Sequence, residues 1–170
     1  SVLELGCSSG GVLAEICKEN PEVIVHGIDF CKKALENADS NFPYKDRATF
    51  TYGDISKDET LSKFSKGQFE MVFSCGAMLY CPPEKNFKIV SKVIDIASRF
   101  CAHIEKQGDD GVHAKLTPRV WNTNFIKKYR KIGGHLAGAI DLRLVLPAFS
   151  IGNADHFIWT NLKDNEALIL

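Results

Sequence analysis

An acidic residue and two glycines stand close together at the start of the chain. Glu4 precedes Gly6 by two residues, and the turn continues to Gly10 in the run VLELGCSSGG. The apolar residues before Gly6 predict a strand, and the pattern after Gly10 predicts a helix. A strand that leads through a glycine turn into a helix commonly holds a nucleotide-like ligand, because glycines admit the ligand to the backbone and the helix N-terminus offers free N–H groups. The segment therefore predicts a cofactor site.

The same turn argues against cofactors that carry phosphates. A dinucleotide fingerprint requires Gly-x-Gly-x-x-Gly, but position 8 is Ser8. The short-chain dehydrogenase pattern also fails, since position 12 is Val12 and the Tyr-x-x-x-Lys pair is missing. A phosphate-binding loop would end in Gly-Lys-Ser/Thr, which the turn lacks. Glu4 would repel a pyrophosphate, whereas it suits a ligand with a positive charge.

Two further carboxylates follow the next predicted strands. Asp29 lies nineteen residues after Gly10, where a carboxylate can accept both ribose hydroxyl protons, and Phe30 could pack beside an adenine. Asp54 follows the third predicted strand. Each of these acids could instead be a strand-end or helix-capping residue, and Glu4 could be a structural acid within the turn. Because ligands bind at the carboxyl ends of parallel strands, three acids at three successive strand ends together favour a site.

The chain resembles the class I S-adenosylmethionine-dependent methyltransferase family, of the type that acts on small molecules. The first motif of that family is an acidic residue, any residue, glycine, three variable residues and a glycine, which Glu4, Gly6 and Gly10 match. The resemblance implies S-adenosylmethionine as the cofactor and S-adenosylhomocysteine as the product. The cofactor-binding residues that we assign are Glu4, Gly6, Cys7, Ser8, Gly10, Asp29, Phe30, Asp54, Ile55, Ser74 and Cys75.

The resemblance also assigns roles within that set. In the family, an Asp in the place of Asp54 receives the adenine amino group, and its neighbour, in the place of Ile55, covers the ring. The end of the fourth strand, at Ser74 and Cys75, corresponds to backbone contacts with the methionine part of the cofactor.

Catalysis of methyl transfer needs alignment more than it needs a particular side chain. The protein must place the acceptor in line with the methyl group and exclude water, and a base is needed only if the acceptor must lose a proton. Tyr80 could orient an acceptor or simply pack. Glu105, at the end of the fifth predicted strand, could reach the site, and His113 in the loop beyond could act as a general base or be an exposed residue without a role.

The acceptor classes can be narrowed by the motifs that are missing. The Asp/Asn-Pro-Pro-aromatic run of amino-methylating nucleic-acid enzymes does not follow the fourth strand, and Cys81-Pro82 reverses the order of a cytosine-C5 nucleophile. The acidic pair of metal-dependent catechol-type enzymes is absent there, so no metal is expected. We therefore expect an oxygen or nitrogen of a small molecule as acceptor. The alternative is a non-catalytic domain of the same fold that binds the cofactor or a partner.

These residues require a parallel sheet to bring them together. Short apolar runs alternate with amphipathic ones, which predicts an α/β, Rossmann-like three-layer sandwich with a seven-stranded, mostly parallel sheet and an antiparallel last strand. The predicted strands are Val2 to Leu5, Val23 to Ile28, Ala48 to Tyr52, Phe69 to Ser74, Phe100 to Glu105, Ala139 to Leu146 and His156 to Asn161.

Four helices are predicted between these strands. The first, Gly11 to Glu19, should bury Val12, Leu13 and Ile16, and the second carries Ala34, Leu35 and Ala38. The third begins at Pro82-Pro83, with Phe87, Val90, Ile94 and Ala97 on one face. The fourth begins at Thr117-Pro118, with Trp121, Phe125, Tyr129 and Ile132 as its apolar stripe.

Composition sets the remaining expectations. With 170 residues the chain fits a single catalytic domain, 1–170, and since it begins inside a strand pattern we expect an N-terminal helical segment to be missing. The 21 basic and 21 acidic residues give no net charge, so neither nucleic acid nor membrane is expected as a partner. The six cysteines lack metal-site spacing, which favours a reduced, cytoplasmic protein. The sequence leaves the oligomeric state open.

Overall fold

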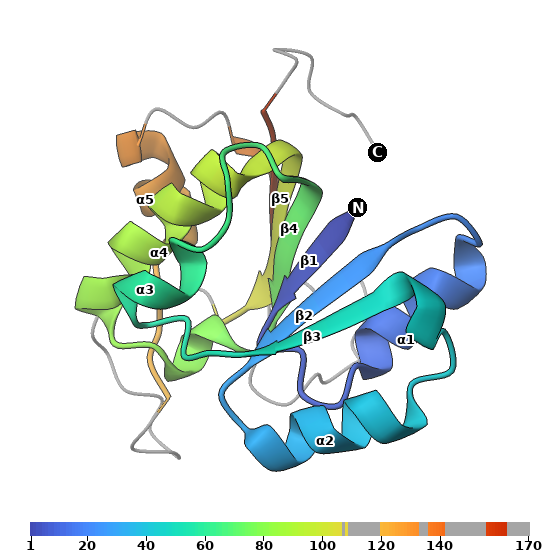
Figure 1. The fold of residues 1–170 in the computed structure, drawn as a ribbon. Coiled ribbons are helices and arrows are strands. Elements are labelled where there is room, and N and C mark those ends of the chain that lie inside the picture. The colour runs from blue at the N-terminus through green and yellow to red at the C-terminus, as the bar shows by residue number, and fades with distance from the viewer. Residues whose placement is uncertain (107, 109–119, 133–135, 142–155, 163–170) are drawn as a thin grey trace.

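Figure 1 shows the computed structural model of the chain, which describes residues 1–106, 108, 120–132, 136–141 and 156–162. The strands are β1 (Val2–Leu5), β2 (Val25–Asp29), β3 (Ala48–Tyr52), β4 (Phe69–Cys75), β5 (Ala97–Glu105), β6 (Leu136–Asp141) and β7 (His156–Asn161). The α-helices are α1 (Gly11–Glu19), α2 (Lys32–Asn41), α3 (Asp58–Leu61), α4 (Pro83–Ile96) and α5 (Phe125–Ile132). Two 3-10 turns, η1 (Lys45–Arg47) and η2 (Met78–Tyr80), precede β3 and α4.

The strands form one seven-stranded sheet in the order β3-β2-β1-β4-β5-β7-β6. Strands β1 to β5 pair in parallel, whereas β7 is antiparallel to both β5 and β6. The predicted sheet and the antiparallel pairing of its last two segments are thus confirmed. Strand β6 begins three residues earlier than expected, and residues 142–146 of the predicted segment lie outside the described residues. The strand order reverses between β1 and β4, and ligands bind at such a switch point in open α/β sheets.

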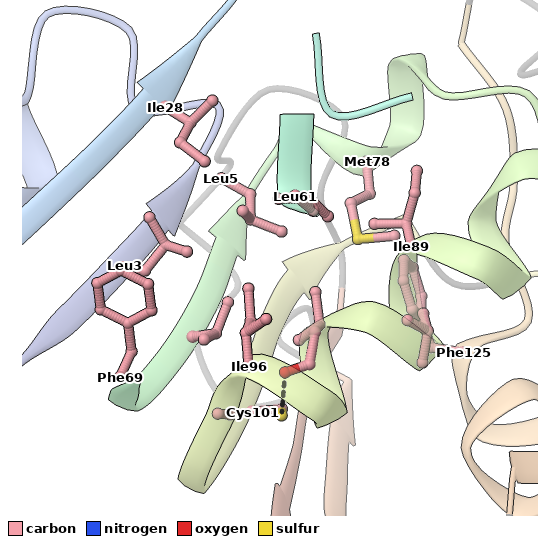
Figure 2. Close-up of a cluster of buried hydrophobic side chains, with 14 of the residues drawn as sticks. Leu3, Leu5, Ile28, Leu61, Phe69, Met78, Ile89, Ile96, Cys101 and Phe125 are labelled. Carbon is pink, nitrogen blue, oxygen red and sulfur yellow. Dashed lines mark hydrogen bonds between the residues drawn. The ribbon is translucent and has the colours of Figure 1, made fainter. Parts of the chain in front are cut away.

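Helices cover both faces of the sheet. In Figure 1, α1 and α2 lie on one face, and α3, α4 and α5 lie on the other. Side chains alternate between the faces along each strand, so Leu3 and Leu5 pack toward α4 while Val2 packs toward α1. The larger apolar cluster, drawn in Figure 2, joins β1, β4 and β5 to α4 and α5 through residues such as Val93, Ile96 and Phe125. This buried core holds the strands whose ends form the site.

The prediction for the last helix was wrong at its N-terminal end. Helix α5 begins at Phe125, where the Asn124 side chain accepts the Lys127 N–H at 2.9 Å and serves as the N-cap. Trp121 lies before the helix, and its backbone N–H donates instead to the Leu79 carbonyl at 2.7 Å. Extended pairing of this segment overrides the helical spacing that the sequence displays. Residues 117 and 118 lie outside the described residues.

Two predicted helix faces are also corrected. In α1, Leu13 and Cys17 are buried, whereas Val12 is 42% exposed, because the core-facing positions are four residues apart. In α4, the buried face is centred on Ile89 and Val93, and Phe87 is 38% exposed. No helix within the described ranges is long and apolar enough to cross a membrane.

Candidate active site

The carboxyl ends of β1, β2, β3 and β4 surround a cavity of about 500 Å³. A cavity of this size lies within the range of small-molecule and cofactor pockets. It lies at the switch point of the sheet, between the loops that follow β1 and β4. The residues that line it are Gly6, Ser8, Ile28, Asp29, Phe30, Gly53, Asp54, Ile55, Ser56, Cys75, Gly76, Ala77, Tyr80 and Cys81.

The turn after β1 needs its glycines for conformation and for space. Gly6 has φ +75° and Gly10 has φ +82°, and Ser8 between them is also left-handed at φ +50°. A Cβ at Gly6 would lie 2.3 Å from the Cβ of Ala77, so the loops after β1 and β4 are in direct contact. At Gly10, a Cβ would meet the rings of Phe42 and Phe50 at 3.0–3.1 Å. Gly6 thus lines the cavity, whereas Gly10 serves helix packing.

Asp29 holds the turn in place. Its Oδ2 accepts the Ser8 N–H and its Oδ1 accepts the Cys31 N–H, both at 2.8 Å. The carboxylate therefore bridges the glycine turn and the start of α2. Each oxygen keeps a second lone pair, and the residue lines the cavity while only 8% exposed. Asp29 can hold the turn and bind a ligand at the same time, because the two bridging bonds use only part of its capacity to accept hydrogen bonds.

Glu4 lies behind the turn and does not line the cavity. It is 2% exposed, and its Oε2 atom has no hydrogen-bond partner among the described residues. Burial, and secondarily the charge of Asp29, raise the pKa of Glu4 to about 8. Burial raises the pKa values of the neighbouring Cys7 and Cys75 thiols, and the charge of Glu4 is the second cause for both. A negative charge here is costly until a positive group compensates it.

The loop after β3 brings the third acid to the cavity. Asp54 Oδ1 accepts the Ser56 N–H at 2.9 Å and closes a tight turn, which leaves its Oδ2 oxygen available. The Gly53 N–H donates to the Asp29 carbonyl at 2.9 Å and joins this loop to the end of β2. Ile55 and Phe30 add apolar surface to the lining, and Phe30 is 64% exposed.

The predicted site residues are thus not all in the cavity. Of the cofactor set, the cavity is lined by Gly6, Ser8, Asp29, Phe30, Asp54, Ile55 and Cys75. The others are buried beside it: Glu4, Cys7 against Gly27, Gly10, and Ser74, whose hydroxyl turns toward His103. The cavity is also lined by Ile28, Ser56 and Cys81, which the sequence motifs did not assign to the site. Their only signal was their position next to strand-end residues.

The three catalytic candidates have different positions. Tyr80 lines the cavity and is 56% exposed, so it can meet a ligand at the mouth. Glu105 is fully buried, does not line the cavity, and binds backbone N–H groups of the loop after β4. His113 lies outside the described residues. Within the described part of the chain, no group of three His, Cys, Asp or Glu side chains could hold a metal ion.

A sequence-family comparison identifies the class of the protein. The family model for a methyltransferase domain matches residues 2–110, more than half of the chain. The chain therefore belongs to the methyltransferase-domain family, as the motif around Glu4 and Gly6 indicated. A comparison with curated protein sequences finds no match.

Solved structures share the fold at low sequence identity. The cyclase SpnF is 8% identical with a TM-score of 0.72, and the match covers 94% of this chain and 73% of SpnF. The magnesium protoporphyrin IX methyltransferase of Synechocystis PCC 6803, solved with bound SAM, is 15% identical with a TM-score of 0.66, over 94% and 68%. A putative methyltransferase of Haloferax volcanii, in complex with the Trm112 activator, is 15% identical with a TM-score of 0.69, over 94% and 80%.

Proposed function

We propose that the chain binds S-adenosylmethionine in the cavity at the strand ends and transfers its methyl group to an oxygen or nitrogen of a small molecule. The charge of the cavity carries this proposal. Its lining contains the carboxylates of Asp29 and Asp54, and no Lys, Arg or His among the described residues. Such a lining disfavours phosphates and suits a ligand with sulfonium and ammonium groups.

The available acceptor atoms fit the parts of that cofactor. Asp29 keeps one lone pair on each oxygen, which suits the two ribose hydroxyls. Asp54 Oδ2 is available for the adenine amino group, and Ile55 and Phe30 provide apolar surface for the ring. Cys75, Gly76 and Ala77 also line the cavity, and the methionine part would lie against them. Glu4 sits behind the turn, where burial raises its pKa to about 8, and a positively charged ligand would favour its ionised form.

S-adenosylmethionine, when bound, supplies a methyl group that its sulfonium already activates. The chain's own residues bind the two reactants, orient them and exclude water. Tyr80 is the side chain best placed to orient an acceptor, because it lines the cavity and remains exposed at its mouth. Cys75 and Cys81 also line the cavity, but burial raises the pKa of Cys75 to about 11 and of Cys81 to about 12, so both are neutral thiols.

The test is turnover. The protein is incubated with S-adenosylmethionine and a panel of hydroxyl, carboxyl and amine metabolites, and S-adenosylhomocysteine is quantified, with tRNA and protein extracts as further arms. We expect product only with one class of small molecule, and loss of product in Asp54→Asn. That variant is well matched, because an Asn Oδ1 can still accept the Ser56 N–H, while the charge is lost and the Oδ2 acceptor becomes an NH₂ donor.

Other outcomes would change the proposal. Product formation only with RNA or protein would contradict a small-molecule acceptor. Cofactor binding without turnover in every arm would favour the non-catalytic binding domain.

A further inference from the structure

A buried carboxylate, that of Glu105, binds the backbone of the loop after β4. Glu105 Oε1 accepts the N–H groups of Ala77 and Met78, each at 3.0 Å, and its Oε2 accepts the Leu79 N–H at 3.2 Å. Three consecutive backbone donors therefore converge on one side chain that is 0% exposed. A buried carboxylate is tolerable only when donors satisfy it, and this loop supplies three of them.

A buried network of side chains includes Ser74, His103 and Tyr129. The Ser74 hydroxyl lies 2.8 Å from His103 Nδ1, and His103 Nε2 lies 2.6 Å from the Tyr129 hydroxyl. Burial lowers the pKa of His103 to about 3, so its ring is neutral. Ser74 favours the ionised form of Glu105, whereas burial, the larger effect, raises the pKa of this carboxyl. The carboxylate accepts three backbone hydrogen bonds, and its side chain does not line the cavity.

The anchored loop forms one wall of the cavity. Gly76, Ala77 and Tyr80 line it, and Ala77 contacts the turn at Gly6. The Trp121 N–H also donates to the Leu79 carbonyl at 2.7 Å, so a later segment of the chain contacts the same loop. Because Glu105 accepts three backbone N–H groups of this loop, the position of the wall depends on Glu105.

We propose that Glu105 is a positioning residue for cofactor and acceptor. It acts through the backbone of Ala77 to Leu79, which it holds against the glycine turn, so that the wall for the methionine part and the side chain of Tyr80 are preset before a ligand arrives. The identity of the ligand rests on the proposed function, whereas the anchoring of the loop does not.

Glu105→Gln tests this role with little change in volume. One of the two acceptor oxygens becomes an NH₂ group, which must face a backbone N–H of the loop. We expect hydrogen exchange at the amides of residues 77–79 to accelerate about tenfold or more, and the Kd for S-adenosylmethionine to rise about tenfold, the effect of losing one charge-assisted bond. Ile96→Ala is the control, because it truncates the buried core at the far end of α4. It should lower the Tm while exchange at 77–79 and the Kd stay unchanged.

Ser74→Ala provides a milder second variant, since it removes the hydroxyl that hydrogen-bonds to His103 and favours the ionised form of Glu105 but leaves the Glu105 side chain in place. It should accelerate exchange at the same three amides by a smaller factor. Unchanged exchange there in both variants would overturn the proposal, as would faster exchange with unchanged affinity. If the wild-type protein does not bind S-adenosylmethionine at all, the proposed function fails, while the exchange data still decide whether Glu105 anchors the loop.

Discussion

Replacing Glu4 by Gln should remove a large pH dependence of stability. Burial raises the pKa of Glu4 from 4.5 to about 8, so between these values the carboxyl is protonated in the folded chain and ionised in the unfolded chain. The folded state then binds more protons, and the free energy of unfolding falls as the pH rises from 4.5 to 8, by about 1.4 kcal/mol per pH unit. Above pH 8 this contribution is constant.

The magnitude can be measured by urea unfolding of both proteins at about pH 5.5 and about pH 9. Across this interval, the contribution of Glu4 to the free energy of unfolding of the wild type should fall by about 3 kcal/mol, and Glu4→Gln should show no such loss. The variant should therefore become more stable relative to the wild type as the pH rises. Saturating S-adenosylmethionine should reduce the difference, because its positive charges compensate the ionised carboxylate. Equal pH slopes for the two apo proteins would refute the raised pKa of Glu4.

Three further substitutions have expected outcomes. Gly6→Val should abolish cofactor binding in calorimetry, because a Cβ at Gly6 would lie 2.3 Å from Ala77; normal binding would contradict the contact between the two loops. Asp29→Asn places an NH₂ group against one of two backbone N–H donors and should lower unfolding stability by about 1–3 kcal/mol even without ligand, measured in urea. Asn124→Ala removes the cap of α5 and should cost about 1 kcal/mol in the same assay, without changing cofactor affinity.

The sequence was most informative where local chemistry and topology agree. The glycine turn, Asp29 and Asp54 were predictable, because each stands at the end of an apolar strand pattern and parallel strands bring such ends to one edge. The structure shows that Asp29 also holds the turn, through hydrogen bonds to two backbone N–H groups. Glu4 is buried behind the turn, which the spacing of the motif does not predict.

Long-range backbone pairing was not predictable. Trp121 has helical spacing to Phe125, but its N–H bonds to Leu79, a contact between segments more than forty residues apart. Glu105 was expected near the chemistry because it ends a strand, and only the fold shows that its carboxylate is used by the loop after β4. Periodicity identifies apolar faces, but it does not identify which backbone groups remain for distant partners.

Calorimetric titration of S-adenosylmethionine into the wild-type chain and Asp54→Asn tests the central claim most directly. The account predicts saturable binding at one site in the wild type, competition by S-adenosylhomocysteine, and weaker binding in the variant, whose turn keeps its bond to Ser56. Absence of saturable binding at millimolar cofactor, in protein shown to be folded by circular dichroism, would contradict the assignment of the cavity.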